Sequence, residues 1–570
     1  MKPKLTRASR LSLSLSLCVI AAAASIFLLS VAKIILTPGA NIYNLFSSSR
    51  NVYVLCILFI SFFLINKGRE ILTFDKLSIG CSIILSFLVV ISTLYDYLTT
   101  NNKLFELSPY HVFSARPAYY IFLFFVLLIF FYFLLLSSRA AWFSVPINSP
   151  AERKPSLVRV LGFLIIYTAI FILLYLPCAP YMSSGDTINQ WQQIHGELPY
   201  NRIHAIGHTI LLKIILSIYD SYTAVIIFHI IAVIIIYLVF SEYFSAKGFS
   251  FSFIAFIFCM GLFISCRYAK AYFYPWKDTV SAVCLSIVCY FIMKYTDNCK
   301  LSIKGALVLG ISLAGCMIFR LNGIVAFTVC GLYFSISFLR RKNYRQLVAM
   351  LMSIVLSYSL VNVYAERVLH PEKYENGFSI QVFASGIAAM VKSGELSQEE
   401  LEEIDHLISV EWMQENYQST VYKLPIIWYP DGSEEIAEDS SLQVFNNKFV
   451  LDLGRNKWDV VALYFKLMPR HFMVCVRDVL GSLRMMWGTS PVFVYSYAFC
   501  ALLLLYLSIK ARLRPKDCAI FLPSVCNTIS IMISTITNEE RYLLPSFMLM
   551  PVYFLYILYK NKEHRKNEFS

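Results

Sequence analysis

A short polar stretch, residues 181–209 (YMSSGDTINQWQQIHGELPYNRIHAIGHT), follows an apolar segment in a mostly hydrophobic chain. Its polar side chains recur at i, i+3, i+4 and i+7, which places them on one face of a short helix over 184–195: Asp186, Asn189, Gln190 and Gln193. Amides together with the aromatic face of Trp191 suit sugar recognition, so we expect a sugar-binding site at this helix. The alternative is that Asp186 has no catalytic or binding role and is simply an acidic residue whose charge is stabilised by the helix dipole at the N-terminus.

Two histidines of this stretch, His204 and His208, are spaced i, i+4 and share one helix face, a geometry that also suits a metal ion. Ala205 stands where an HExxH zinc protease carries its glutamate, which excludes that chemistry. A divalent ion shared by His204, His208 and Asp186 is one interpretation. Hydrogen bonding of the two imidazoles to a sugar or a phosphate is preferred, and a purely structural role explains them about as well.

The amino-acid composition indicates the class of protein to which this polar stretch belongs. Of the 570 residues, 58% are hydrophobic and only 15% are charged, against about 25% charged residues in a soluble globular protein. Apolar runs of about 20 residues, long enough to cross roughly 30 Å of hydrocarbon, recur along the chain. The sequence therefore predicts a polytopic membrane protein. The net charge of +14 comes from short Lys and Arg clusters without a basic domain, which argues against a nucleic-acid partner.

The apolar segments predict fourteen spans: 11–36, 51–66, 77–96, 117–136, 160–178, 221–240, 250–266, 278–294, 303–319, 323–340, 347–364, 489–509, 517–535 and 544–560. With both termini cytoplasmic, the densest basic clusters all face the cytoplasm, as the positive-inside rule requires: KPKLTR, RRKNYR (340–345), KARLRPK (510–516) and KNKEHRK (560–566). Segment 204–220 is too short to span and carries Lys213. We therefore expect it to be an amphipathic helix on the outer membrane surface.

This topology places several polar segments on one outer face. They are residues 179–220, RYAKAYFYPWKD (267–278), Arg320–Asn322, TNEERYLLP (537–545) and the acidic segment 365–488, which holds more than half of the chain's 35 Asp and Glu residues. The predicted organisation is an N-terminal four-span unit (1–136), a membrane core (160–364), the outer segment (365–488) and a C-terminal three-span unit with a basic tail (489–570). In the outer segment, apolar residues at helical spacing predict helices: Leu401, Ile404, Ile408 and Trp412. IIWYPDGSEE (426–435) reads as a turn.

The order of these motifs resembles the GT-C superfamily of membrane glycosyltransferases, which includes protein mannosyltransferases and lipid-A aminoarabinose transferases. The resemblance covers roughly 160–345. It rests on a span ending at an external acid, then INQWQQIHG, a histidine-bearing amphipathic helix and an external WKD, with a looser echo in RYLLP. A bacterial branch with a D-x-x-x-Q loop and a later KD is more similar. The expected fold is an all-α polytopic membrane protein of about fourteen transmembrane helices, GT-C-like, with external juxtamembrane helices and a mainly helical outer domain.

The resemblance implies transfer of a sugar from a polyprenyl-phosphate-linked donor to a glycan, lipid or protein acceptor outside a bacterial plasma membrane. Asp186 maps onto the catalytic base of such enzymes. Many relatives carry a second acid next to the base, but here Thr187 follows Asp186, so Asp278 of PWKD is the candidate for the second carboxylate. No cofactor is implied beyond the donor itself. Gln190, Trp191, His204 and His208 would bind the substrate.

The departing lipid phosphate would need cations, and five basic side chains lie in the predicted outer loops or at span ends: Arg267, Lys270, Lys277, Arg320 and Arg541. Arginine grips phosphate oxygens through two donors, whereas lysine acts as a point charge. Arg320, in MIFRLNG between two apolar runs, is the most informative because an unpaired charge there is expensive and usually functional. Three of them have a structural alternative: Arg320 could reach toward lipid headgroups, Lys277 could form a surface ion pair with Asp278, and Arg541 could belong to a solvated cluster with Glu539 and Glu540.

Two other function classes are open. A polymerase or ligase of lipid-linked polysaccharide would use cations and a histidine of the large outer segment: Arg470, His471 and Arg484. A lipid-oligosaccharide or solute transporter would place charges at the bilayer midplane and often repeat its two halves. Here the charges collect at span ends and no internal repeat is visible, which favours the glycosyltransferase.

Overall fold

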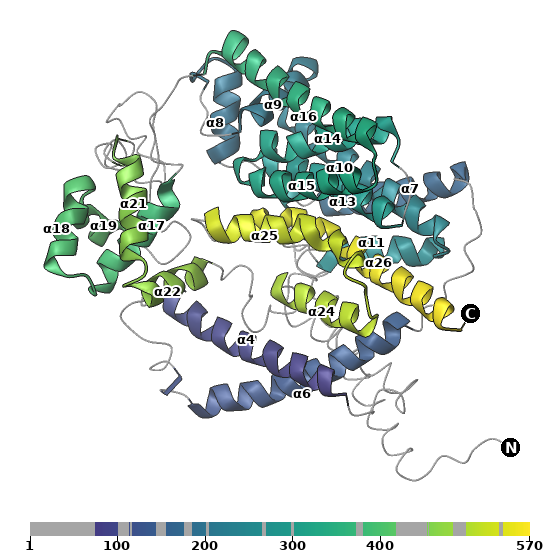
Figure 1. The fold of residues 1–570 in the computed structure, drawn as a ribbon, viewed down its shortest axis with the longest axis horizontal. Helices are drawn as coiled ribbons and strands as arrows, with labels where there is room; N and C mark the ends of the chain where they lie inside the picture. The colour runs from purple at the N-terminus through teal and green to yellow at the C-terminus, as the bar shows by residue number, and fades with distance from the viewer. Residues whose placement is uncertain are drawn as a thin grey trace, which may run out of the picture.

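The structure is a computed structural model that describes residues 75–100, 113–114, 117–143, 156–175, 185–200, 205–264, 270–297, 301–371, 380–417, 453, 455–482, 497–534 and 540–569. Within these residues the only regular secondary structure is helical, as Figure 1 shows. The expected all-α class is confirmed for this part of the chain. The predicted spans 11–36 and 51–66 and the predicted turn at 426–435 lie outside the described residues.

Six described helices are long and apolar enough to cross a membrane. They are α4 (Lys76–Thr100), α6 (Pro117–Phe143), α7 (Leu157–Tyr175), α10 (Tyr222–Ala246), α13 (Lys277–Thr296) and α16 (Tyr344–Tyr364), which continues as the π-helix η4 (Ala365–Leu369). Large apolar side chains on these helices point outward. Phe122 is 70% exposed and Ile165 is 67% exposed. Lipid is the solvent that tolerates such a surface, so the chain is a helical membrane protein with several spans.

Shorter helices complete the bundle. They are α8 (Gly185–Ile194), α9 (Ile206–Ile218), α11 (Phe251–Ile264), η2 (Lys270–Phe273), α14 (Ile303–Phe319), η3 (Leu321–Gly323), α15 (Ile324–Arg340), α24 (Tyr497–Lys510), η7 (Asp517–Phe521), α25 (Leu522–Ser534) and η8 (Glu540–Leu543), followed by the long α26 (Leu544–Phe569). Each of the twelve predicted spans from 77–96 onward overlaps a described helix. Several have only 10–17 residues, fewer than the roughly 20 needed to cross the hydrocarbon. The count of about fourteen spans therefore stays a prediction.

Helix α13 has the largest buried share of the six candidate spans. It contacts α10, α14, α25 and α26. Small residues allow the close approach: a Cβ added to Gly315 of α14 would lie only 2.6 Å from Sγ of Cys284. On the same helix, a Cβ on Gly310 would overlap Ser353 of α16. Such small residues let membrane helices pack backbone to backbone, so α14 lies close to α13 on one side and to α16 on another.

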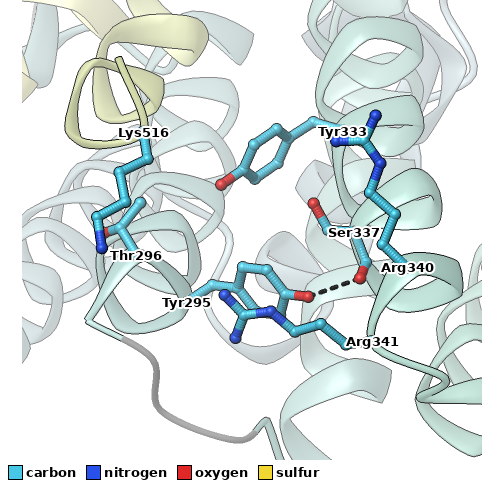
Figure 2. A pocket seen from close by; sticks show the side chains of 7 residues that line it. All are labelled: Tyr295, Thr296, Tyr333, Ser337, Arg340, Arg341 and Lys516. Carbon is cyan, nitrogen blue, oxygen red and sulfur yellow. Dashed lines mark hydrogen bonds between the residues drawn. The ribbon is translucent and has the colours of Figure 1, made fainter. Parts of the chain in front are cut away.

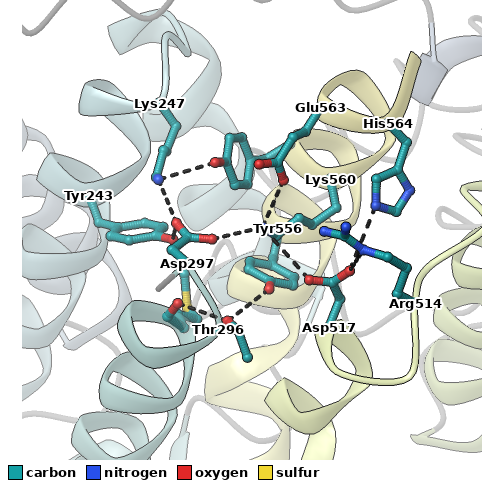
Figure 3. A network of polar contacts seen from close by, with 12 residues as sticks. Tyr243, Lys247, Thr296, Asp297, Arg514, Asp517, Tyr556, Lys560, Glu563 and His564 are labelled. Carbon is teal, nitrogen blue, oxygen red and sulfur yellow. Dashed lines mark hydrogen bonds and ion pairs between the residues drawn. The ribbon is translucent and has the colours of Figure 1, made fainter. Parts of the chain in front are cut away.

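A group of charged side chains closes the C-terminal end of α13 (Figure 3). Asp297, directly after the helix, lies 2.5 Å from Nζ of Lys247 and 2.8 Å from Nζ of Lys560, and it accepts a hydrogen bond of 2.6 Å from the hydroxyl of Tyr243. Lys560 also lies 3.7 Å from Asp517. These residues come from α10, α13, η7 and α26 and from the turns next to them. The Asp297 network therefore joins elements far apart in the sequence.

The N-terminal helices pack against the C-terminal ones. α4 and α6 lie side by side (Figure 1). The hydroxyls of Ser78 in α4 and Tyr506 in α24 are 2.8 Å apart, and the rings of Phe131 and Phe499 have centroids 5.9 Å apart. Asp75, at the start of α4, pairs with Lys510 at 2.7 Å. One hydrophobic core therefore runs from α4 to α26.

A second group of helices has its own core, at the left of Figure 1. It consists of α17 (Gln381–Ser393), α18 (Gln398–Leu407), α19 (Val410–Asn416), α21 (Lys457–Leu467) and α22 (Phe472–Ser482). The predicted apolar stripe faces this core. Ile404 and Ile408 are buried, Trp412 is 9% exposed, and Leu401 packs at the edge. The prediction of helices in this part of segment 365–488 is confirmed.

Candidate functional site

The first turn of α13 carries a fully buried carboxylate. The chain enters the helix through Trp276, whose ring stacks on Tyr274 with centroids 4.0 Å apart. Two residues later, Asp278 has no exposed surface. The positive end of the helix dipole favours a carboxylate at this position, but burial of a charge requires a partner of opposite sign.

Arg320 supplies this opposite charge. Its extended backbone ends α14, and its carbonyl accepts a 2.9 Å hydrogen bond from the amide of Gly323 in the tight η3 turn. Nη1 of Arg320 lies 3.1 Å from Oδ1 of Asp278, and the two side chains are 5% and 0% exposed. Two residues that the sequence places in separate loops of one candidate site therefore form a buried ion pair.

The RYLLP segment covers the arginine. The guanidinium of Arg320 lies 4.8 Å from the ring centroid of Tyr542 in η8, and Nη1 lies 3.5 Å from the Tyr542 carbonyl oxygen. Helix α25 holds these turns together. Asn527 donates to the same carbonyl at 3.2 Å, and Ser530 donates to the carbonyl of Asn322 at 2.5 Å. The start of α13, the end of α14, η3 and η8 thus meet in one region, called here the Asp278–Arg320 site.

The polar atoms of this site are incompletely satisfied by the described residues. Beyond the ion pair, the oxygens of Asp278, Nη2 of Arg320 and Oγ1 of Thr279 have no hydrogen-bond partner among them. Leaving a buried polar group unpaired costs about 1–3 kcal/mol, and more for a charge. Proteins keep few such groups, and membrane charges of this kind mark functional sites. A phosphate could accept a hydrogen bond from Nη2, and a substrate hydroxyl could donate to Asp278.

Helix α8 has the predicted polar face, and this face is turned inward. Gln190 and Gln193 are 2% and 1% exposed, whereas Ile188 is 46% exposed. Oε1 of Gln190 lies 3.0 Å from Nδ1 of His208, so that nitrogen carries the proton, and Nε2 of Gln190 donates to Oγ1 of Thr209 at 2.9 Å. Gln190 and His208, which the sequence predicts to bind substrate, therefore connect α8 to α9 inside the protein.

Trp191 lies half-buried on α8. Its ring centroid is 4.5 Å from that of His195 and 4.2 Å from that of Tyr222. His195 in turn lies 3.0 Å from the carboxylate of Asp220. The hydrogen bond to Asp220, with a second to the Trp191 carbonyl, raises the pKa of His195 above its ordinary value of 6.5. The indole is thus part of an aromatic stack that fixes the loop after α8.

The α8–α9 pair lies at the same end of the bundle as the Asp278–Arg320 site. Helices α9 and α14 approach closely at Gly207, where an added Cβ would overlap Cγ2 of Ile318 and lie 2.9 Å from the Ile318 carbonyl oxygen. Ile318 is two residues before Arg320. The polar helix α8, its partner α9 and the buried ion pair are therefore neighbouring parts of one region.

The other predicted site residues are only partly described. Lys277 lies half-buried next to Asp278. Residues 204 and 267, His204 and Arg267, are outside the described residues. Three more have a described backbone but no described side chain: Asp186 in α8, Lys270 in η2 and Arg541 in η8. The roles of these residues stay predictions.

A metal site can be sought only among the described residues. No three His, Cys, Asp or Glu side chains among the described residues lie close enough together to hold an ion. Of the predicted set of Asp186, His204 and His208, only the side chain of His208 is described, and it contacts Gln190. The alternative of a divalent ion therefore stays untested.

Arg470 and His471, which a polysaccharide polymerase or ligase would use, both contact the carboxylate of Glu400. Arg470 lies 3.2 Å and His471 lies 3.3 Å from the carboxylate of Glu400. Glu400 also accepts from the backbone amide of Ser397 at 3.0 Å and completes the capping box at the start of α18. A structural role joining α18 to the turn before α22 accounts for both basic residues. Arg484 lies outside the described residues.

Sequence reasoning did not single out three residues of the site: Thr279, Asn527 and Ser530. A signal was available for Asn527, because an amide within the apolar run VCNTISIMIS is expensive in a membrane helix unless it is paired. Nothing in the sequence says that its partner is the backbone of Tyr542. That contact depends on how α25 lies against η8.

No family model, curated protein or solved structure matches the chain.

Proposed function

We propose that this chain is a membrane glycosyltransferase that moves a sugar from a polyprenyl-phosphate-linked donor to an acceptor on the outer side of a bacterial plasma membrane. The observation that carries the proposal is the buried Asp278–Arg320 pair at the start of α13. A buried cation and carboxylate at the ends of apolar helices would suit the phosphate of a lipid-linked anionic substrate, which supports the proposal. The resemblance to the GT-C superfamily supplies the reaction class.

Arg320 suits the donor phosphate. Its Nη1 is engaged by Asp278 and the Tyr542 carbonyl, whereas Nη2 has no hydrogen-bond partner among the described residues. An arginine held in this way keeps its planar fork oriented and can still offer donors to phosphate oxygens. Negative charge grows on the phosphate as the sugar leaves. The interaction therefore strengthens toward the transition state, which is what lowers a barrier.

The two carboxylates have different roles in this proposal. Asp186, in the first turn of α8, accepts the proton of the acceptor hydroxyl while the hydroxyl oxygen attacks the anomeric carbon. The bond between that carbon and the lipid phosphate oxygen breaks, and the phosphate keeps its electron pair. Asp278 orients Arg320 and is the second carboxylate. Gln190 and His208 are positioning residues, because their hydrogen bond joins α8 to α9.

The remaining cations belong to the same proposal. Lys277 is adjacent to the buried acid, and three others lie in segments that flank the site: Arg267, Lys270 and Arg541. Lysine and arginine near a membrane surface attract anionic headgroups. They would raise the local concentration of the donor, with Arg320 making the contact to the leaving group.

The test compares a single with a paired substitution. Asp278→Asn leaves Arg320 as a buried unpaired charge, at a cost of about 3–5 kcal/mol, so inactivity of this variant alone could reflect poor folding. Asp278→Asn combined with Arg320→Gln removes both charges. We expect the double variant to regain normal abundance in the membrane but not the transfer of a labelled sugar from polyprenyl phosphate. Recovery of both abundance and transfer would show that the pair is only structural.

A second arm addresses the base. Asp186→Asn should lower transfer by about 10²–10⁴-fold at normal abundance, the usual contribution of a general base. Glu197→Gln is the control, because Glu197 is an exposed acid in the same polar region, directly after α8. Full transfer by both Asp186→Asn and the double variant contradicts the proposal. Sensitivity to Arg470→Gln instead would favour a polysaccharide polymerase or ligase.

A further inference from the structure

A cavity of about 260 Å³ lies at the C-terminal end of α13 (Figure 2). Its described lining comes from three parts of the chain: Tyr295 and Thr296 of α13, Tyr333, Ser337, Arg340 and Arg341 at the end of α15, and Lys516 before η7. Asp278 lies at the other end of α13, about 27 Å from Thr296 at 1.5 Å per residue. The cavity is therefore separate from the Asp278–Arg320 site.

The charge around the cavity is one-sided. Three of the lining side chains are cations, and none of those described is acidic. Arg340 and Lys516 form no ion pair with a described residue. Both side chains are exposed, so a ligand can reach them. The nearby Asp297 is not available to them, since Lys247 and Lys560 neutralise it. Clustered cations without acids create a positive potential that favours an anion.

Aromatic and hydroxyl groups shape the cavity. The hydroxyl of Tyr295 donates to the Ser337 carbonyl at 2.8 Å, and the guanidinium of Arg341 lies 3.9 Å from the Tyr295 ring centroid. These contacts hold Arg341 across one wall. The hydroxyl of Tyr333 points into the space between the two helices (Figure 2). A phosphate placed there would find a phenol donor as well as cations, which together give directional binding.

The outer surface of α15 indicates where the rest of a ligand would lie. Tyr333, Ser337 and Arg340 follow one another along one face of the helix. The adjacent face carries Leu332, Ile336 and Leu339, which are 56%, 48% and 50% exposed. In a helix of a membrane protein such a stripe is covered by acyl chains. A cationic pocket beside a lipid-covered stripe at a helix end is the arrangement that binds anionic lipid headgroups.

We infer that this cavity binds the phosphate group of an anionic ligand, with Arg340, Lys516 and the Tyr333 hydroxyl as its donors. The source of the phosphate is either a membrane phospholipid or a soluble phosphate. The apolar stripe of α15 favours the phospholipid. The predicted topology, which places RRKNYR and KARLRPK on the cytoplasmic side, would make this an inner-leaflet site.

The experiment uses the full chain in nanodiscs and measures bound lipid by native mass spectrometry. One arm uses phosphatidylcholine with a minor fraction of phosphatidylglycerol, and the other uses phosphatidylcholine alone with inorganic phosphate in the buffer. Arg340→Gln combined with Lys516→Gln is the test variant. Arg345→Gln is the control, because Arg345 is an exposed arginine of the same basic cluster that does not line the cavity.

For a lipid phosphate, the unmodified chain retains phosphatidylglycerol, the test variant binds it about tenfold more weakly, and the control is unchanged. Tyr333→Phe should weaken retention without changing the net charge. If inorganic phosphate binds in the second arm and displaces the lipid when it is added to the first arm, the ligand is a soluble phosphate. Equal losses in the test variant and in Arg345→Gln, or no retention and no phosphate binding at all, would overturn the inference.

Discussion

Arg320 makes three contacts that depend on its shape as much as on its charge. It pairs with Asp278, approaches the Tyr542 carbonyl and lies over the Tyr542 ring. A planar guanidinium can do this because its five N–H donors point in several directions, whereas an ammonium is a compact point charge. At this position the two basic residue types are not equivalent.

Arg320→Lys is therefore informative. The lysine can still neutralise Asp278, so we expect the protein to reach normal abundance in the membrane. It cannot pair with the acid and also offer donors to a phosphate. Sugar transfer should fall about 10–100-fold, the loss expected for a charged hydrogen bond of about 1.5–3 kcal/mol. The assay measures transfer per amount of protein, and unchanged transfer would mean that Nη2 does not contact the substrate.

The His195–Asp220 pair makes a pH-dependent contribution near neutrality. Because the pKa of His195 is raised in the folded protein, its charged form stabilises the fold below about pH 6.5. This contribution is lost as the pH rises through the higher folded value. We expect Asp220→Asn to lower thermal stability at pH 5.5 more than at pH 8.5, by a small amount since both groups are partly exposed. Equal effects at both pH values would contradict this assignment.

Which residues belong to the site was partly readable from the sequence. Arg320 stands between apolar runs, and Asp278 begins one, so both are marked by the expense of charge in a membrane. Their contact was not readable, because it depends on α13 packing against α14 through small residues such as Gly315. The inward orientation of Gln190 was also hidden. Periodicity shows which side chains share a face but not which element covers that face.

At the scale of elements, glycines set how closely the helices approach. Gly207→Ala should gain about 1 kcal/mol in helix propensity. The new methyl would overlap Ile318 and lie 2.9 Å from its backbone oxygen, and overpacking of this kind costs about 1–3 kcal/mol. We expect the clash to dominate, since a backbone atom cannot move aside. The melting temperature of the purified protein should fall and sugar transfer should decrease.

Gly331→Ala is the matched control for this change. Gly331 lies inside α15, and an added Cβ there meets nothing within 4 Å, so the same propensity gain comes without a clash. Its melting temperature should stay the same or rise. A decrease equal to that of Gly207→Ala would show that close packing of α9 on α14 is not the cause.

Element boundaries were predictable where the apolar pattern is sharp. The polar helix expected at 184–195 is α8 at Gly185–Ile194, and the spans expected at 303–319 and 323–340 are α14 and α15 almost residue for residue. The span expected at 489–509 is described only from Tyr497 onward, where it is α24 (Tyr497–Lys510). Hydropathy measures transfer to an apolar environment and does not distinguish helix from other apolar chain, so it places helices better than it places their ends.

For the whole molecule, the Asp297 network joins the C-terminal ends of α10 and α13 to η7 and α26. Burial would raise the pKa of Asp297, but hydrogen bonds from Lys247, Lys560 and Tyr243 hold it below its ordinary value. The folded state therefore gains stability from this carboxylate above about pH 3.8, and loses it as the pH falls further. Such a network could not be predicted from the sequence, because its members come from three separate segments: α10, α26 and the turn after α13.

Asp297→Asn should destabilise the whole protein. Without the carboxylate, Lys247 loses its acidic partner and the buried Lys560 keeps only Glu563 and Asp517. Loss of one partner of a buried ion pair costs up to about 3–5 kcal/mol. We expect a clear loss of melting temperature in detergent and lower abundance in cells. Asp459→Asn, an exposed acid on α21, is the control with the same change of charge and should behave as the unmodified chain. Equal stability of both variants would contradict a structural role for the network.

Helix α13 is secured at its two extremities, by Arg320 at the start and by two lysines just past the end. Helix α13 therefore cannot shift along its axis or rotate without breaking an ion pair in the poorly solvated protein interior. It is a fixed element of the bundle. On the proposed function, any movement that admits the isoprenoid donor would then be made by the helices around α13, while Arg320 keeps its position.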